Sequence, residues 1–353
     1  MPKILVNLYK LKNTNNGLGQ VALNMGKYLS SLPNAEDFIL LVPEKYIGFF
    51  GDRVSYIRSN FFNKYFSFHT GEINVLHLIH QLSPKRASGK TKTVLTIHDL
   101  NFIFEKKSDS KRNKYLRKVQ KKVDRADALI FISGFTKNFS NKHLNIPDSK
   151  VQKVIYNGVE IDTDKQTEKP AFLPPGDFLF TIGEIKNKKN FHVLIGFLKK
   201  LQHPYNLVIA GNSTSDYADS ILKLAEKENL TDRVILPGMI SEDDKIYLYR
   251  HCKAFVFPSL YEGFGLPVIE AMRFGKPVFS STSTSLPEIG GKLAFYWDNF
   301  DPAYMADVFT EKMELYLSDP KYAEKLMEYS SAFTWEKSIK KYNDLYSELI
   351  KKP

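Results

Sequence analysis

Cysteine and tryptophan are scarce in this chain of 353 residues, which has one Cys and two Trp. The single cysteine, Cys252, excludes an internal disulfide framework and is compatible with a reducing compartment. No apolar run approaches the roughly 18 residues that span a bilayer. The first residues favour a strand over a secretory signal. We therefore expect a cytoplasmic protein.

Clustered metal ligands are also lacking. The eight His residues are scattered along the chain. The only close pair is His77 and His80, whose spacing fits one helix face, although the residues around them favour a strand. We therefore expect no metal and no other cofactor.

Negative charge is scarce in the first half of the chain. The formal net charge is +11, and residues 1–160 contain 26 Lys and Arg against 12 Asp and Glu. Residues 105–125 form a basic amphipathic segment, which contains Lys106, Lys107, Lys111, Arg112, Lys114, Arg117, Lys118, Lys121, Lys122 and Arg125. A solvated helix face and a contact with an anionic membrane surface both explain it. Nucleic-acid binding is less favoured, because basic and aromatic residues do not alternate here, and we expect no nucleic-acid partner.

Apolar strand-like runs alternate with helical stretches along the whole chain. Such runs occur at residues 4–6, 38–42, 75–79, 93–97, 128–132, 154–156, 178–183, 206–210, 234–236, 254–257 and 277–280. This alternation is typical of parallel sheets with helices on both faces. The length fits two α/β domains. We place them at residues 1–165 and 177–335, joined by a Pro-rich linker at 166–176, with a final helix at 336–353.

The most informative segment is residues 258–272, PSLYEGFGLPVIEAM. It follows an apolar strand and reads as a glycine loop that opens into a helix with Pro267 in its first turn. Backbone N–H groups and the helix dipole then converge on a point that suits a phosphate. Glu262 and Glu270 flank the loop eight positions apart, and carboxylates accept hydrogen bonds from sugar hydroxyls. Together these features favour a nucleotide-sugar site.

This segment resembles the Glu-x7-Glu motif of retaining glycosyltransferases with the GT-B fold, the family 4 or group 1 type, in its bacterial surface-polysaccharide branch. The similarity continues over residues 275–291, GKPVFSSTSTSLPEIGG. The resemblance implies two Rossmann-like, doubly wound α/β domains that face each other across a cleft. It also implies that the last helix crosses back to the N-terminal domain.

On the donor side, the resemblance assigns Lys189 and the preceding basic Lys188 to the diphosphate. Glu184 occupies a position where some members have Arg, so Lys186 and Lys188 remain alternatives for the second phosphate partner. The donor diphosphate and sugar are further assigned to Gly17, Gly19, Gly263, Phe264, Gly265 and Leu266. The ribose and base are assigned to Glu270, Gly211, Asn212, Gly238, Met239 and Ile240.

On the acceptor side, His98 and Asp99 follow an apolar strand at a position that faces the ligand crevice of a parallel sheet. Asp99 either orients His98 or caps the next segment. Ser133 and Thr136 resemble the start of a cleft-facing helix in the family, although an N-cap explains them equally well. The Gly17-Leu18-Gly19 loop after the first strand is a weak signal without the resemblance.

The resemblance implies a retaining, metal-independent hexosyltransferase, with His98, Lys189 and Glu262 as catalytic residues. We expect a nucleotide-sugar donor, GDP-mannose or a UDP-hexose, and a lipid-linked saccharide acceptor of O-antigen, lipopolysaccharide or capsule synthesis. The basic segment 105–125 then suits the inner face of the cytoplasmic membrane. Two alternatives remain: another GT-B enzyme such as a nucleotide-sugar 2-epimerase, or a non-catalytic basic module that binds membranes or nucleic acid.

Overall fold

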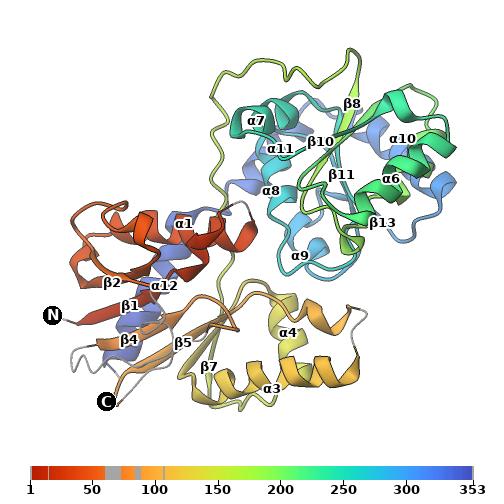
Figure 1. Ribbon diagram of the computed structural model, residues 1–353. Helices are drawn as coiled ribbons and strands as arrows, with labels where there is room; N and C mark the ends of the chain where they lie inside the picture. The colour runs from red at the N-terminus through yellow and green to blue at the C-terminus, as the bar shows by residue number, and fades with distance from the viewer. Residues whose placement is uncertain (1, 15, 60–72, 84–88, 106–107, 352–353) are drawn as a thin grey trace. The chain divides into compact units, whose positions relative to one another are not determined.

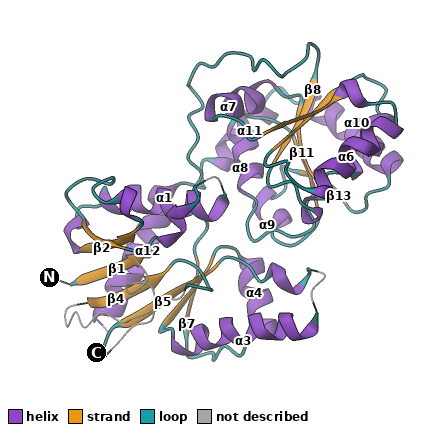
Figure 2. Ribbon diagram, viewed as in Figure 1, coloured by secondary structure: helices purple, strands orange, loops and turns teal. Residues whose placement is uncertain are grey.

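The computed structural model describes all residues except 1, 15, 60–72, 84–88, 106–107 and 352–353. It divides the chain into two compact units. The first consists of Met1–Glu160 together with Phe333–Pro353, and the second of Ile161–Ala332. Each unit is a parallel sheet with helices on both faces (Figures 1 and 2).

The first unit contains a seven-stranded parallel sheet in the order β3-β2-β1-β4-β5-β6-β7. Its strands are β1 (Lys3–Asn7), β2 (Phe38–Val42), β3 (Ser55–Arg58), β4 (Ile73–Leu78), β5 (Lys92–Ile97), β6 (Ala128–Phe131) and β7 (Val151–Val154). Its helices are α1 (Gly17–Ser30), α3 (Asp109–Arg125), α4 (Gly134–His143) and α12 (Trp335–Lys351). The strand order reverses beside β1, which is where a doubly wound sheet binds ligands.

The two faces of this sheet carry separate apolar cores. In β1, Ile4 and Val6 belong to the core shared with α1 and α12, whereas Leu5 belongs to the core that includes Val119 and Val123 of α3. Successive side chains of a strand point to opposite faces. A central strand covered on both sides must therefore be apolar throughout, which explains the continuous runs in the sequence.

The second unit contains a six-stranded parallel sheet in the order β10-β9-β8-β11-β12-β13. Its strands are β8 (Phe178–Ile182), β9 (Asn206–Ala210), β10 (Val234–Gly238), β11 (Ala254–Phe257), β12 (Val278–Ser281) and β13 (Phe295–Trp297). Its helices are α5 (Val193–Lys200), α6 (Asp216–Lys227), α7 (Glu242–His251), α8 (Leu266–Arg273), α9 (Leu286–Gly290), α10 (Pro302–Ser318) and α11 (Tyr322–Ser330). The order again reverses, here beside β8.

The C-terminal helix α12 packs on the first unit, against α1 and β4. Its buried residues are Trp335, Ser338, Ile339, Tyr342, Leu345, Tyr346 and Leu349. The chain leaves the first unit and re-enters it at neighbouring points. There the Val159 N–H donates to the Phe333 carbonyl over 3.0 Å. Gly158 is required here, since an added Cβ would lie 2.2 Å from the backbone nitrogen of Trp335.

Several expected boundaries need correction. The strand expected at 154–156 is β7, which ends at Val154, and the sequence did not indicate β3 or β13. Residues 166–176, expected as a linker, form no helix or strand and are grouped with the second unit, and their role as a linker stays a prediction. Helix α3 begins at Asp109 because Ser108 caps it, its hydroxyl accepting from the Lys111 N–H. Lys106 and Lys107 lie outside the described residues. None of the described helices is long and apolar enough to cross a membrane.

Candidate active site

Three glycines lie at the carboxyl ends of neighbouring strands in the second unit. Gly183, Gly211 and Gly238 follow or end β8, β9 and β10, and all have positive φ. Their backbones are in close contact: an added Cβ on Gly211 would lie 1.8 Å from the Gly183 oxygen. Glycine is therefore required for this approach. At this edge of the sheet, where the carboxyl ends of the three strands meet, backbone rather than side chains lines the surface.

Lys189 is buried at this edge. It ends the short helix η5 (Asn187–Lys189), and only 7% of the residue is exposed. Gly183 leaves room for it, because an added Cβ would lie 3.1 Å from the Lys189 Cε. The Lys189 ammonium also lies 4.6 Å from the ring centroid of Phe257. A lysine is rarely buried unless a counter-charge accompanies it.

That counter-charge is Glu262. Lys189 Nζ lies 2.5 Å from Glu262 Oε1, and the two side chains are 9% and 14% exposed. Burial by itself raises the pKa of Glu262, but the charges of Lys189 and Lys188 and the hydrogen bonds from Lys189 and Ser259 outweigh it. The pKa is held below its usual value. The site therefore holds a fixed carboxylate and a fixed ammonium side by side.

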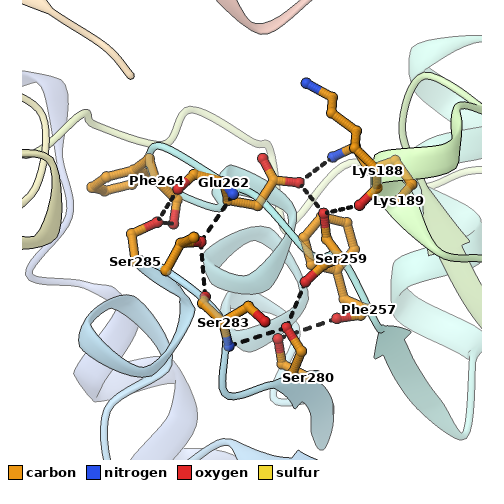
Figure 3. A network of polar contacts seen from close by, with 11 residues as sticks. Lys188, Lys189, Phe257, Ser259, Glu262, Phe264, Ser280, Ser283 and Ser285 are labelled. Carbon is orange, nitrogen blue, oxygen red and sulfur yellow. Dashed lines mark hydrogen bonds and ion pairs between the residues drawn. The ribbon is translucent and has the colours of Figure 1, made fainter. Parts of the chain in front are cut away.

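Hydroxyl side chains position the Glu262 loop (Figure 3). The Ser259 hydroxyl is 2.7 Å from Glu262 Oε1. Thr284 Oγ1 accepts from the Glu262 N–H over 3.0 Å, and the Ser285 hydroxyl lies 3.0 Å from the Glu262 carbonyl and 2.9 Å from that of Phe264. Thr284 and Ser285 come from the turn between β12 and α9, whereas Ser259 lies three positions before Glu262.

Thr284 has a strained backbone. Its φ is +55°, a left-handed conformation that is exceptional for a β-branched residue. Such strain persists only where the surroundings over-determine it, and it is common at functional sites. Here the conformation accompanies the hydrogen bond between Thr284 Oγ1 and the Glu262 N–H.

The loop then enters α8 at Gly265. Its φ is +111°, and an added Cβ would lie 2.8 Å from Leu286 Cδ2. Both facts demand glycine at this N-cap, and Pro267 occupies the first turn as expected. The first amides of a helix lack partners within the helix. Pro267 has no N–H, and the Val268 N–H donates to the Gly265 carbonyl over 3.0 Å. The start of α8 therefore offers the Leu266 N–H and the positive end of the helix dipole to an anion.

The two alternatives for a second cation differ in their contacts. Lys186 Nζ forms an exposed ion pair with Glu184, 2.5 Å away. Lys188 is half-buried, its carbonyl accepts from Leu260 N–H over 2.8 Å, and its charge helps to lower the pKa of Glu262. Lys188 is thus the cation nearer to Glu262.

Glu270 lies on α8 and is already bonded within the protein. The buried Tyr249 hydroxyl donates to Glu270 Oε2 over 2.8 Å, and Lys245 Nζ lies 3.9 Å from Oε1. Burial by itself lowers the pKa of Lys245, but the charges of Glu270 and Glu242 outweigh burial, so the pKa lies above its usual value. These contacts orient the carboxylate, and sequence reasoning missed them because Tyr249 and Lys245 lie on α7.

The residues expected to line the base pocket occupy the adjacent strand ends. The Asn212 side chain is bonded locally, since its Oδ1 accepts from the Thr214 N–H and hydroxyl over 3.0 and 2.7 Å. Met239 is 56% exposed, and Ile240 is half-buried. Recognition of a base by backbone groups stays a prediction here.

In the first unit, His98 lies at the end of β5 and is 5% exposed. Its Nε2 is 2.7 Å from the Ile79 carbonyl, and its pKa falls to about 4 because of burial, despite that hydrogen bond. Asp99 Oδ1 accepts from the Asn101 N–H over 3.0 Å. In this structure Asp99 therefore caps the next turn.

Ser133 and Thr136 form the N-terminal cap of α4. The Ser133 hydroxyl accepts from the Thr136 N–H over 3.1 Å, and both residues are almost fully buried. Thr136 Oγ1 lies 3.4 Å from the His98 carbonyl. The pair thus supports the His98 segment from behind, and direct contact with an acceptor stays a prediction.

Gly17 and Gly19 are not in a loop, contrary to expectation. They lie in the first turn of α1, because Asn16 caps the helix and its side chain accepts from the Gly19 N–H over 2.9 Å. An added Cβ on Gly19 would lie 1.8 Å from the Asn13 oxygen, whereas nothing lies within 4 Å of one on Gly17. Gly19 is needed for close packing, and a donor contact stays a prediction for both.

One acidic triplet was missed at the sequence level. Asp162-Thr163-Asp164 has the Asp-x-Asp spacing that often serves a divalent cation. Asp162 Oδ1 accepts instead from the N–H groups of Asp164 and Lys165, over 3.0 Å each. Among the described residues, no group of three or more His, Cys, Asp or Glu is arranged to hold a metal.

Comparison with protein families identifies the class. The family "Glycosyl transferases group 1" matches residues 162–333, and "Glycosyltransferase Family 4" matches residues 16–163. The chain therefore belongs to the group 1, family 4 glycosyltransferases, and its two doubly wound sheets form the GT-B fold. The predicted family and fold are confirmed.

Curated relatives place it near O-antigen enzymes. It is 33% identical to a serotype-specific mannosyltransferase, WbdA, of Escherichia coli over 69% of this chain and 32% of that protein. It is 29% identical to the O-antigen chain mannosyltransferase RfbU of Salmonella typhimurium over 57% and 55% of the two chains. The chain spans about a third of the length of the WbdA proteins it matches.

Solved structures share the fold at low identity. A glycosyltransferase from Rickettsia africae superposes with a TM-score of 0.75 at 17% identity, over 100% of this chain and 99% of that one. HepE of Anabaena, in complex with UDP and glucose, gives 0.72 at 16% identity, over 99% and 100%.

Proposed function

We propose that this chain is a retaining, metal-independent hexosyltransferase that uses a nucleotide-sugar donor, GDP-mannose or a UDP-hexose. The observation that carries the proposal is the buried Lys189–Glu262 pair, held beside the N-terminus of α8 at the strand ends of the second unit. The mannosyltransferase relatives favour GDP-mannose, and the UDP complexes of HepE favour a UDP-sugar.

In this proposal the departing diphosphate is stabilised by fixed positive groups. The difficult step is cleavage of the bond between the anomeric carbon and the phosphate oxygen, and negative charge grows on that oxygen. The Lys189 ammonium and the N-terminus of α8, with its Leu266 N–H, meet this charge without reorganising. Lys188 supplies a second cation. Because these groups neutralise the diphosphate, no divalent cation is required in this scheme.

The two glutamates bind hydroxyl groups. Glu262 fixes Lys189 and directs its remaining acceptor capacity to the transferred sugar. Glu270, oriented by Tyr249, accepts from the ribose hydroxyls. Retention follows if the acceptor attacks from the face that the diphosphate leaves, with the leaving phosphate oxygen taking the acceptor proton. The product's anomeric configuration, read by proton NMR, tests this; an inverted product contradicts it.

The proposed acceptor is a lipid-linked saccharide of O-antigen, lipopolysaccharide or capsule synthesis, at the inner face of the cytoplasmic membrane. The names of the relatives support the saccharide. The exposed cations of α3, Lys111, Lys114, Arg117, Lys118, Lys121 and Arg125, support the membrane surface. Each basic residue near an anionic surface contributes on the order of 1 kcal/mol.

Flotation with phosphatidylglycerol vesicles tests the membrane contact. Changing Lys114, Lys118 and Lys121 to Glu should abolish flotation at low salt. A matched triple change of Lys200, Lys223 and Lys227, which are exposed in the second unit, should leave it intact. An equal loss of flotation in both variants would mean that vesicle binding depends on the net charge of the chain and not on α3.

The function itself is tested by nucleotide release from a panel of UDP-, GDP-, ADP- and dTDP-sugars, with and without EDTA. We expect release from one donor, unaffected by EDTA, and at least tenfold weaker nucleotide binding in Glu270→Ala. The control is Glu242→Ala, which removes the other partner of Lys245, 2.8 Å away, without touching Glu270. If the chain neither released nucleotide from any donor nor bound any donor, the proposal would be refuted.

A further inference from the structure

His80 lies beside His98 at the ligand edge of the first sheet and has no role in the scheme above. It follows β4, the strand that pairs with β5, and its ring centroid is 6.0 Å from that of His98. The residue is 7% exposed. A histidine this buried ordinarily satisfies both ring nitrogens.

Hydrogen bonds determine which nitrogen carries the proton in each ring. His80 Nδ1 lies 3.1 Å from the Leu82 N–H, which can only donate, so Nδ1 is the acceptor and Nε2 carries the hydrogen. His98 Nε2 lies 2.7 Å from the Ile79 carbonyl, which can only accept. The His98 proton is therefore also on Nε2, and its Nδ1 carries a lone pair.

The remaining nitrogens lack partners in the described part of the chain. No hydrogen bond reaches His80 Nε2 or His98 Nδ1 there. Both residues are almost fully buried, at 7% and 5% exposure, but neither nitrogen is completely enclosed, so each retains some solvent-accessible surface. One ring thus presents a donor, and its neighbour presents an acceptor.

The charge state of the pair is stable near neutral pH. Burial, together with the charges of His98 and Lys10, lowers the pKa of His80 to about 2. Burial and the charge of Lys10 lower the pKa of His98 to about 4, despite its hydrogen bond to the Ile79 carbonyl. Both rings are therefore neutral, and the donor and acceptor roles do not interchange. Lys10 lies in η1 (Tyr9–Lys12), directly after β1.

We propose that His80 Nε2 and His98 Nδ1 form a donor–acceptor pair that binds hydroxyl groups of the acceptor saccharide. This inference rests on the proposed function. A hydroxyl can accept from His80 and donate to His98, whereas a carboxylate anion has only acceptors at neutral pH and would face the His98 lone pair. The pair therefore selects a neutral sugar over an anionic group at this edge.

The test uses the full chain labelled with nitrogen-15 in its histidines. Side-chain spectra are recorded while methyl α-mannoside, α-glucoside and α-galactoside are added separately, and acetate in a further titration. We expect the His80 and His98 signals to show protonated Nε2 and to shift together with one glycoside. The signal of the exposed His203 should stay constant. No response to any glycoside, or a response to acetate alone, would overturn the proposal.

Two variants separate the hydrogen bond from the shape of the ring. His80→Phe keeps a ring without the donor and should weaken glycoside affinity about tenfold, the usual effect of one lost hydrogen bond. His80→Gln keeps an N–H at similar reach and should weaken it less than threefold. His203→Gln should have no effect. A folded Phe variant, matched to wild type by thermal unfolding, that binds the glycoside equally well would overturn the proposal.

The outcomes remain distinguishable from those of the nucleotide-release assay. The titrations contain no donor, so they report on His80 even if no nucleotide-sugar is turned over. Turnover in wild type without any histidine response would refute this inference and leave the proposed function standing.

Discussion

At the scale of single residues, the properties of the site depend on charges placed where water cannot reach them freely. A buried ion pair is a weak source of stability, but removal of one partner leaves an uncompensated charge. Lys189 and Glu262 are such a pair. Their joint presence is better explained by a need for a fixed cation than by a need for stability.

Lys189→Met should therefore destabilise the second unit by about 3–5 kcal/mol, whereas Lys189→Met combined with Glu262→Gln should cost less, because neither charge remains. Denaturant unfolding at pH 7 measures both. A double variant less stable than the single one would contradict this reasoning.

The Lys189–Glu262 pair also predicts that the stability of the second unit depends on pH. The folded pKa of Glu262 is depressed, so its stabilising contribution is complete above the unfolded value of about 4.3 and is lost as pH falls through the folded value. The stability of wild type relative to the double variant should fall between pH 5 and pH 3. A constant difference over this range would show that the pKa of Glu262 is not depressed in the folded state.

Thr284 allows strain and hydrogen bonding to be separated. Thr284→Val keeps the strained backbone but loses the acceptor for the Glu262 N–H, so we expect a loss of about 1–3 kcal/mol. Thr284→Gly relieves the strain and loses the same bond, so its stability should lie near that of wild type. Thermal unfolding checks both. A Val variant as stable as wild type would mean that the bond contributes nothing.

At the scale of elements, α12 is joined to the first sheet through a buried histidine. His77 lies on β4; its Nε2 is 2.8 Å from Thr96 Oγ1 and its Nδ1 is 2.6 Å from the Tyr346 hydroxyl of α12. Burial, together with the charge of His98, lowers the pKa of His77 to about 3. The contact therefore requires a neutral ring.

Acid should therefore unfold the first unit before the second. The folded pKa values of His77, His80 and His98 all lie below the unfolded value of about 6.5, so their stabilisation is complete above that pH and decreases as pH falls. Each contributes at most about 1.4 kcal/mol per pH unit.

Tryptophan fluorescence can follow each unit separately, because Trp335 lies in the first and Trp297 in the second. Trp297→Phe leaves the first reporter and Trp335→Phe the second. We expect the Trp335 signal to change at the higher pH during acid titration. Simultaneous transitions, or an earlier change of Trp297, would contradict the prediction.

At the scale of the whole molecule, the first unit is discontinuous and the second is continuous. Six large apolar or aromatic side chains of α12 complete the core of the first unit, and burying one such side chain contributes about 1.5–3 kcal/mol. Their sum is similar to the total stability of a domain, about 5–15 kcal/mol.

A chain truncated after residue 332 should therefore contain an unfolded first unit and a folded second unit. Residues 161–332 alone should keep native Trp297 fluorescence and bind nucleotide. Limited proteolysis of the truncated chain should yield a resistant fragment from the second unit. Protection of the first unit would show that α12 is dispensable.

The sequence by itself determined the features that depend on neighbouring residues. Central strands covered on both faces must be continuous apolar runs, so they were visible as such. The Gly265 N-cap and the Pro267 helix start were visible for a similar reason, because their backbone requirements restrict residue type locally. The family and the α/β class follow from these local patterns.

Tertiary structure alone decided which distant groups meet. Lys189 and Glu262 are separated by 73 positions, and His77 and Tyr346 by 269. The apolar pattern did not indicate β3, because that strand is largely exposed, or β13, because it has only three residues. Hydrophobic periodicity indicates which face of an element is buried, but not which other element covers that face. Charges and hydroxyls from distant parts of the sequence therefore become partners only when the chain has folded.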